Sequence, residues 1–264
     1  MSTIYEIFGR DAHAMTIALM ERAEVITAIP AGASVALKPN LVVAGQPEYG
    51  ATTHAGVLSG AIEYLREHGV RDISIIEGSW VGDSTARRQR QMCIRDRALT
   101  IVDSICGDLD FEEGGNPVPT GRMLLGTDMV QIDAYGCRLM GLGPAQVPYI
   151  GLAERWGAGS SALAEGELVR LNAPTDGAEY PRPSGAVAAL TRAVQARSAC
   201  SACYASLVRA LHRSGGTNKA VAIGQGWKGM PFDGLGVGAC CDCAREQVKG
   251  CPPSAGDILR AMDA

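Results

Sequence analysis

Residues 34–43 read SVALKPNLVV, an apolar run that Lys38, Pro39 and Asn40 interrupt. Short apolar runs of this kind are typical of buried strands, and we expect this one to deliver polar side chains at its C-terminal end. Residues 72–77 read DISIIE and predict a second strand.

An amphipathic helix is predicted between these two strands. Thr52 and Thr53 can cap its N-terminus, and Gly69 ends it. Its apolar face consists of Val57, Leu58, Ala61, Ile62 and Leu65. A strand, a helix and a strand in this order form a βαβ unit, whose two strands are parallel. The predicted fold class is therefore α/β with a parallel sheet.

Helices and strands continue to alternate on both sides of this unit. Residues 11–28 carry apolar side chains at helical spacing, and Pro30 ends that segment. Residues 98–105 predict a strand, and residues 123–126 lead into a helix that Asp128 caps.

A linker is predicted at residues 172–184, NAPTDGAEYPRPS, because this segment is rich in Pro, Gly and polar residues. The linker separates an α/β domain at residues 1–171 from a cysteine-rich, metal-binding region at residues 185–264.

Composition narrows the classes of partner. The formal net charge is -4, and the basic residues are scattered except for a run at residues 87–90, so nucleic acid is a poor partner. No stretch approaches the roughly eighteen consecutive apolar residues of a membrane-spanning helix. Residues 1–14 lack the pattern of a secretory signal. We therefore expect a cytoplasmic protein that binds neither membranes nor nucleic acid.

Residues 91–97 read QMCIRDR and do not resemble native sequence. Back-translation of this heptapeptide gives a transposase end sequence that serves as a sequencing adapter. We interpret it as a cloning or assembly scar and exclude it from fold reasoning; the alternative is an ordinary basic loop. On this interpretation native sequence stops near residues 85–90 and resumes near Ala98, and Cys93 is not a ligand.

Nine cysteines in a reducing compartment indicate metal binding or redox chemistry rather than disulfides. Two thiolates of a C-x-x-C motif can reach one metal centre. A glycine-rich stretch, GVGACCDC, and the sequence GCPP follow the C-x-x-C motif further along the chain. The six cysteines of these three stretches are Cys200, Cys203, Cys240, Cys241, Cys243 and Cys251.

These stretches supply the four thiolates that a [4Fe-4S] cluster requires. We predict Cys200, Cys203, Cys240 and Cys251 as its ligands, and Cys241 can replace Cys240 because adjacent side chains point differently. A structural zinc site uses the same ligand types at similar spacing and stays open as the alternative cofactor. Buried thiols without a metal, or a thiol-disulfide pair at Cys200 and Cys203, are further alternatives.

Four strings resemble one protein family. They are ALKPNLV at residues 36–42, TTH at 52–54, EGSWVGDST at 77–85 and GTDMVQIDAYGCRLMGL at 126–142. Together they resemble the family catalogued as Domain of Unknown Function 362, whose members are often associated with iron-sulfur clusters. The resemblance covers most of residues 34–157, and the GCPP tail is similar to that of cluster-carrying members.

The chain departs from the family pattern at two places. Ala55 stands where the family pattern has Pro. The block that members usually have between residues 85 and 98 is absent, which accords with an internal deletion at the scar. The resemblance implies a fold and a cluster more than a reaction.

Candidate catalytic residues lie at the C-terminal ends of the two predicted strands, where open α/β folds bind ligands. Lys38 can hold an anion such as a carboxylate or phosphate, and Glu77 can act as an acid, a base or a metal ligand. A surface ion pair and a solvated carboxylate are the respective alternatives. Donors from Asn40, Thr52, Thr53 and His54 can join an anion site at the helix N-terminus.

Other polar residues carry weaker indications. Asp103 and Asp133 stand at places that the family pattern also uses, with capping or surface roles as alternatives. Glu112, Glu113 and Asn116 belong to a glycine-rich loop that is either a binding loop or a turn. Cys106 and Cys137 are expected to be small core residues. No dinucleotide or P-loop motif supports a nucleotide site.

Three hypotheses for function follow. The first is an iron-sulfur protein that transfers electrons, or performs redox chemistry on a small substrate, with a redox partner protein or a small anionic substrate. The second is a zinc- or cluster-stabilised binding module. The third is a non-redox enzyme that uses Lys38 and Glu77 on a small anionic substrate.

Overall fold

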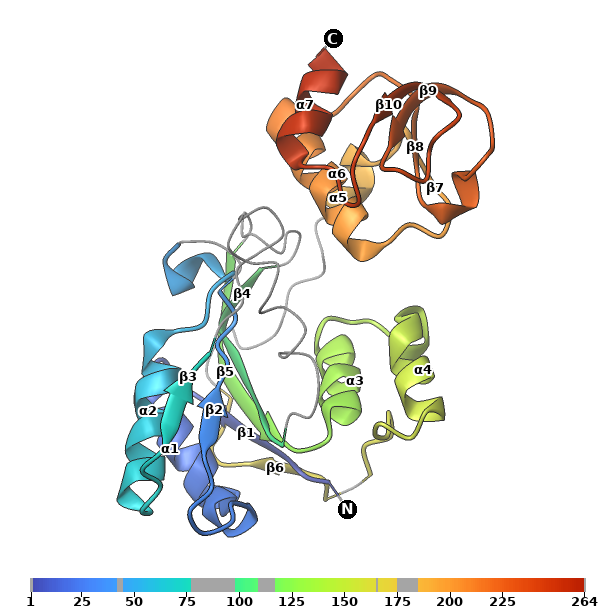
Figure 1. The fold of residues 1–264 in the computed structure, drawn as a ribbon. Helices are drawn as coiled ribbons and strands as arrows, with labels where there is room; N and C mark the ends of the chain where they lie inside the picture. The colour runs from blue at the N-terminus through green and yellow to red at the C-terminus, as the bar shows by residue number, and fades with distance from the viewer. Residues whose placement is uncertain are drawn as a thin grey trace. The chain divides into compact units, whose positions relative to one another are not determined.

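The computed structural model divides the chain into two compact units, Met1–Pro183 and Ser184–Ala264. It describes residues 2–41, 45–76, 98–108, 117–164, 166–174 and 185–263 (Figure 1). The proposed scar and residues 175–184 of the predicted linker lie outside the described residues.

A mixed four-stranded sheet forms the centre of the first unit. Its strands are β1 (Ile4–Phe8), β4 (Thr100–Asp108), β5 (Pro117–Gly126) and β6 (Leu168–Arg170), in the order β4-β5-β1-β6. β5 runs antiparallel to both β4 and β1, and β1 runs parallel to β6. β4 confirms the strand predicted at residues 98–105.

Helices cover both faces of this sheet (Figure 1). On one face α1 (Ala12–Arg22) and α2 (Ala55–Glu67) pack against Met123 and Leu125 of β5. On the other face α3 (Met129–Leu139) packs against Leu124. Successive side chains of β5 point to opposite faces of the sheet, so β5 contributes to the core on each face.

The predicted βαβ unit is confirmed. β2 (Val35–Leu37) pairs in parallel with β3 (Ile73–Ile75), and α2 connects them. The two strands form a sheet of their own in the described part of the chain. The three-residue length of β2 leaves Lys38 just beyond its carboxyl end.

The predicted caps differ in outcome. Asp128 caps α3 as expected, because its side chain accepts a hydrogen bond from the Gln131 amide. The prediction that Thr52 or Thr53 caps α2 is wrong, since His54 occupies the N-cap position without a side-chain bond. Thr53 instead exchanges hydrogen bonds with the backbone of Asn40 and ties the loop after β2 to the start of α2.

The helix predicted at residues 11–28 is only half right. α1 ends at Arg22, and a 3-10 helix, η1 (Val25–Ala28), follows. Glu24 between them has a φ of 48°, in the left-handed region, which breaks the α-helical path. The described part of the unit also contains three short helices, η2 (Pro47–Tyr49), η3 (Pro144–Gln146) and α4 (Pro148–Arg155).

A charged group sits inside the first sheet. Glu6 on β1 is fully buried and accepts hydrogen bonds from Tyr135 at 2.9 Å and Arg170 at 2.7 Å. Nη1 of Arg122 lies 3.2 Å from Oε1 of the same Glu6 carboxylate. A buried carboxylate is tolerated only when it is paired in this way.

The second unit is also an α/β structure, which sequence analysis did not predict. Strands β7 (Val194–Ala196), β8 (Val221–Ile223), β9 (Phe232–Val237) and β10 (Ala244–Val248) form a sheet in the order β10-β9-β8-β7. All three strand pairs are parallel. The remaining elements are α5 (Ala186–Leu190), α6 (Ser201–Ser214), η4 (Gln225–Trp227) and α7 (Ala255–Asp263).

The core of the second unit joins two helices to the sheet. Leu207 and Leu211 of α6 and Ile258 of α7 are fully buried against Val221 and Leu235 of the strands. This core holds the amino end of α6, where the C-x-x-C motif lies, in a fixed place relative to the loops around β9 and β10.

Candidate functional site

The C-x-x-C motif lies at the N-terminus of α6. Cys200 is the N-cap residue, and Cys203 is the third residue of the helix. Cys200 is exposed and Cys203 is half-buried. Both sulfurs lie at the end of the helix where backbone N–H groups point outward and the helix dipole is positive.

The other two cysteine stretches meet beyond the ends of β9 and β10. The Gly238 amide donates to the Val248 carbonyl at 2.9 Å, and the Ala239 amide donates to the Gly250 carbonyl at 2.8 Å. Cys240 and Cys251 each follow directly after the second of these bonded pairs. These bonds therefore bring two stretches that are distant in sequence to one edge.

Gly238 joins that edge to the C-x-x-C motif. Its φ is 95°, and a side-chain carbon at this position would lie 3.6 Å from Cys203 Sγ and 3.7 Å from the Gly250 carbonyl oxygen. A glycine here lets the loop pass close to the sulfur without strain. The backbone of the other two cysteine stretches thus passes close to Cys203.

The pKa of the Cys203 thiol is affected by the neighbouring cysteines. Burial raises the pKa of its thiol, and the charges of Cys251, Cys200, Cys240 and Cys241 raise that pKa further, in this order of importance. Like charges act this way only at short range in a protein. Several thiolates here would need a cation between them.

The two adjacent cysteines face different surroundings. Cys241 is buried, donates its thiol hydrogen to the Ala222 carbonyl at 3.3 Å and packs with Trp227. Burial raises the pKa of the Cys241 thiol. Cys240 is half-buried, and Cys243 is exposed. Cys241 therefore belongs to the core of the unit, and Cys240 remains accessible.

No three His, Cys, Asp or Glu side chains in the described part of the chain are grouped closely enough to hold a single metal ion. Nor does a helix in that part have the length and apolar character to cross a membrane.

A second cluster of polar side chains lies at the carboxyl end of β2. Lys38 is exposed, and its Nζ donates to the Pro39 carbonyl at 3.1 Å. The bonds between Asn40 and Thr53 place His54 at the same edge. The other predicted catalytic residue, Glu77, lies outside the described residues, as do Cys93, Glu112, Glu113 and Asn116.

His54 forms a pair with Asp103 of β4 that sequence analysis missed. Asp103 Oδ2 accepts hydrogen bonds from His54 Nδ1 at 2.8 Å and from the His54 backbone amide at 2.7 Å. The side chains are 15% and 9% exposed. Because Nδ1 carries the donated hydrogen in the neutral ring, Nε2 keeps a lone pair that can accept a proton.

The remaining candidates have local structural roles. Asp133 accepts a hydrogen bond from the Tyr149 hydroxyl at 3.0 Å; burial, together with this carboxylate, raises the pKa of Tyr149 to about 12. Cys137 is buried as predicted. Cys106 is only half-buried, so the prediction of a core residue is wrong there, and its thiol donates to the Glu48 carbonyl at 3.0 Å.

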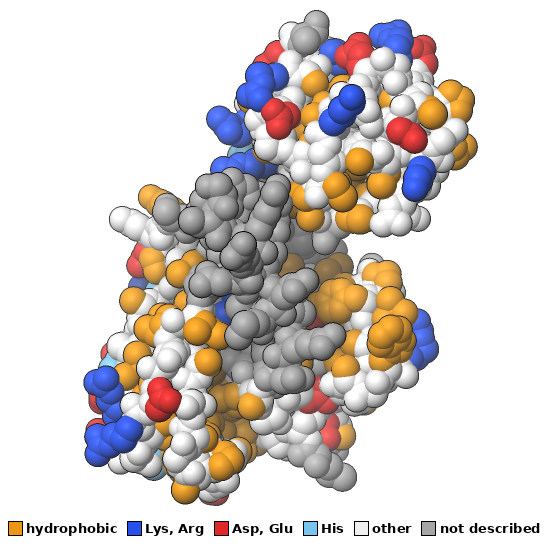
Figure 2. Space-filling model, viewed as in Figure 1, with side chains coloured by type: hydrophobic (Ala, Val, Ile, Leu, Met, Phe, Trp, Pro, Cys, Tyr) orange, Lys and Arg blue, Asp and Glu red, His pale blue; other side chains and the backbone are white. Residues whose placement is uncertain are grey.

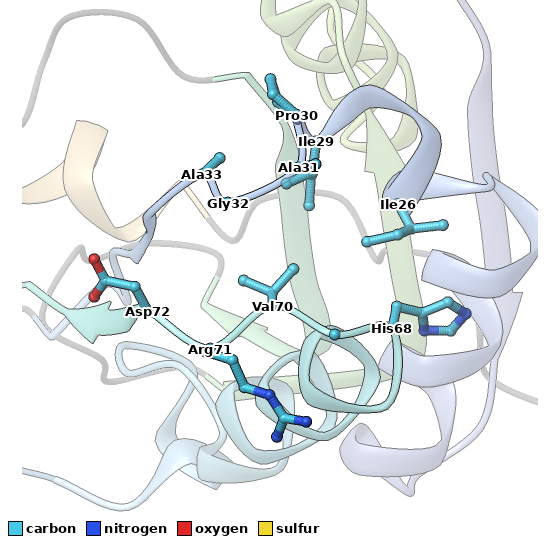
Figure 3. Close-up of a pocket in the computed structure, with 11 residues that line it drawn as sticks. Ile26, Ile29, Pro30, Ala31, Gly32, Ala33, His68, Val70, Arg71 and Asp72 are labelled. Atoms are coloured by element: carbon cyan, nitrogen blue, oxygen red, sulfur yellow. The ribbon is translucent and has the colours of Figure 1, made fainter.

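A groove in the first unit lies away from these candidates. Its lining includes Ile29, Val70 and Asp72 (Figure 3). These residues precede β2 and β3, so the groove lies at the amino ends of the parallel strands. Ligands of open α/β sheets bind at the carboxyl ends.

Comparison with known families gives one match. Residues 35–97 match the family model described as Domain of unknown function (DUF362). The match ends at the last residue of the proposed scar and confirms, over these residues, the family that the sequence strings predict. No curated protein and no solved structure matches the chain.

Proposed function

With the DUF362 segment as premise, we propose that this protein carries a [4Fe-4S] cluster and transfers electrons to or from a partner protein or a small substrate. The proposed ligands are Cys200, Cys203, Cys240 and Cys251. The family match lies within the first unit, whereas the proposal itself rests on the cysteines of the second unit.

One observation carries the proposal: the backbone of the other two cysteine stretches passes close to Cys203 of the C-x-x-C motif. Four thiolates are the ligand set of a four-iron cluster. Such a core is broader than one ion, so its ligands lie further apart than the ligands of a single metal ion. Gly238 leaves backbone rather than a side chain beside Cys203 Sγ, which suits a bulky inorganic group.

The surrounding chain prepares this place for a charged cofactor. The N-terminus of α6 offsets the negative charge of the thiolates at Cys200 and Cys203. Partial burial of Cys203 limits the access of water to one side. When bound, the cluster would supply one-electron redox chemistry, and the protein would hold it close to the surface near exposed Cys200.

Metal analysis after anaerobic purification tests the proposal. We expect about four irons and four sulfides per chain, and we expect Cys203→Ser to lose most of both. Cys243→Ser is the matched control, since Cys243 is exposed and outside the proposed ligand set. Stoichiometric zinc without sulfide would remove the redox proposal and leave a structural zinc site.

A second candidate function rests on the pair of His54 and Asp103. An imidazole oriented by a buried carboxylate is an arrangement that serves proton transfer. Lys38 at the same edge offers a positive charge for an anion, so the candidate is a non-redox enzyme acting on a small carboxylate or phosphate. The charge of Lys38 and the proton acceptor at His54 would act together.

NMR titration tests this second candidate without a known substrate. Inorganic phosphate and acetate serve as probes, and the ring signals of His54 report binding. We expect saturable shifts that Lys38→Ala abolishes and that the removal of all six C-terminal cysteines leaves intact. Equal shifts at His54 and at exposed His13 would show nonspecific binding and count against this function.

A further inference from the structure

A short segment after β8 packs against the residues that lead into the C-x-x-C motif. The Gln225 amide donates to the Ser198 carbonyl at 3.1 Å, and the Gly226 amide donates to the Arg197 carbonyl at 3.0 Å. Two successive backbone bonds fix the position of this segment relative to Cys200, which lies two residues further along the chain.

Gly224 and Arg197 also take part in this contact. Gly224 has a φ of 112°, and a side-chain carbon on it would lie 2.7 Å from the Ala199 amide nitrogen. No other residue fits this approach without strain. On the other side, the Arg197 guanidinium lies 3.9 Å from the centre of the Trp227 ring, a cation-π distance. Both contacts hold Gln225 in place.

The side chain of Gln225 is aimed at a sulfur. Its Nε2 lies 3.3 Å from Cys200 Sγ and donates a hydrogen bond to it. The packing of the segment explains why a flexible side chain keeps this direction. Nothing about the overall fold of the unit requires the bond, because Cys200 is exposed and lies outside the buried core.

We propose that Gln225 is a positioning residue that raises the reduction potential of the cluster through its hydrogen bond to the Cys200 thiolate. The inference rests on the function proposed above. A donor to a ligating sulfur draws charge away from it, and this stabilises the reduced cluster, which carries one more electron. One electron enters the cluster, and no covalent bond forms or breaks.

Redox titration of the full-length, cluster-loaded protein tests the proposal. Gln225→Leu keeps the size of the side chain and removes the donor; Gln225→Glu replaces the donor with a charged acceptor. We expect Gln225→Leu to shift the one-electron equilibrium about tenfold toward the oxidised form, which is about 59 mV. Gln225→Glu should shift it at least as far. Gln195→Leu, a change at an exposed glutamine of β7, should leave it unchanged.

The outcomes separate this inference from the proposed function. If wild type and both Gln225 variants carry the cluster at the same potential, the inference fails and the cluster proposal stands. If wild type binds no iron and sulfide, the proposed function itself fails and the inference falls with it. If Gln225→Leu loses the cluster, the Gln225→Glu potential decides, and an unshifted value overturns the inference.

Discussion

Replacing Cys240 and Cys241 one at a time separates a ligand from a core residue. Cys241 is 1% exposed, and its thiol donates to the Ala222 carbonyl. Cys241→Ala removes a buried sulfur and leaves that carbonyl without its donor, at a cost of about 1–2 kcal/mol in the free energy of unfolding. Cys240→Ala removes a half-exposed group and should cost less than about 0.5 kcal/mol in the metal-free protein.

Cluster content should respond in the opposite order. We expect Cys240→Ala to lose most of its iron and sulfide, because it removes one of the four proposed ligands. Cys241→Ala should keep both. Stability and cluster content thus give the two variants reversed rankings, which a general loss of folding cannot produce.

The assay needs a probe that reports on the second unit alone. Trp227 contacts Cys241 and lies in that unit. Urea unfolding of metal-free protein can follow its fluorescence in a background where Trp80 and Trp156 are replaced by Phe. Loss of the cluster in Cys241→Ala together with its retention in Cys240→Ala would refute the assignment of the two side chains.

Three further predictions follow from the first unit. Glu6→Gln should lower the free energy of unfolding by about 3–5 kcal/mol, since it leaves buried positive charge uncompensated; urea unfolding checks this, and Arg170→Gln, at a half-exposed partner, should cost much less. The Tyr149 phenol should titrate near 12, so the stability that it contributes is complete below pH 10 and is lost as the pH rises toward 12; ultraviolet titration should show a lower pKa in Asp133→Asn. Ile75 is 55% exposed on β3, so we expect Ile75→Lys to reduce light scattering when the protein is concentrated. An unchanged concentration threshold for aggregation would show that exposed Ile75 does not promote aggregation.

Apolar side chains also gather on α4 and near it. Tyr149, Leu152 and Trp156 are exposed there, and Figure 2 shows this surface at the side of the first unit. If the proposed scar replaces native sequence, strands missing from the sheet would also leave apolar surface exposed. Resequencing the coding DNA across residues 85–100 addresses that expectation directly.

Sequence patterns predicted the elements that depend on residues close to one another in the chain. The βαβ unit followed from an apolar run, a helical period and a second run, and the cap at Asp128 followed from one side chain. The sheet of the second unit did not follow, because glycines interrupt the apolar residues of β9, FDGLGV, and polar side chains fill most of β10, AREQV. Neither segment has the apolar pattern by which a buried strand is recognised.

The pair of His54 and Asp103 was missed for a related reason. The residues are 49 positions apart and meet only because β4 passes the start of α2. From the sequence, His54 is a donor at the helix N-terminus and Asp103 belongs to the family pattern, so the two side chains have separate predicted roles. A hydrogen bond between distant segments depends on the packing of α2 against the sheet, and no spacing rule within either segment encodes it.

The choice between Cys240 and Cys241 shows what register adds to a motif. Residues 238–241 form a turn in which the Cys241 amide donates to the Gly238 carbonyl at 3.2 Å, and its two adjacent cysteines face different surroundings. The bonds from Gly238 to Val248 and from Ala239 to Gly250 fix the register beyond β9 and β10. With this register the Cys241 side chain lies in the core. The spacing of the cysteines therefore predicts a binding centre, whereas the bonds between the two stretches leave Cys240 accessible and Cys241 in the core.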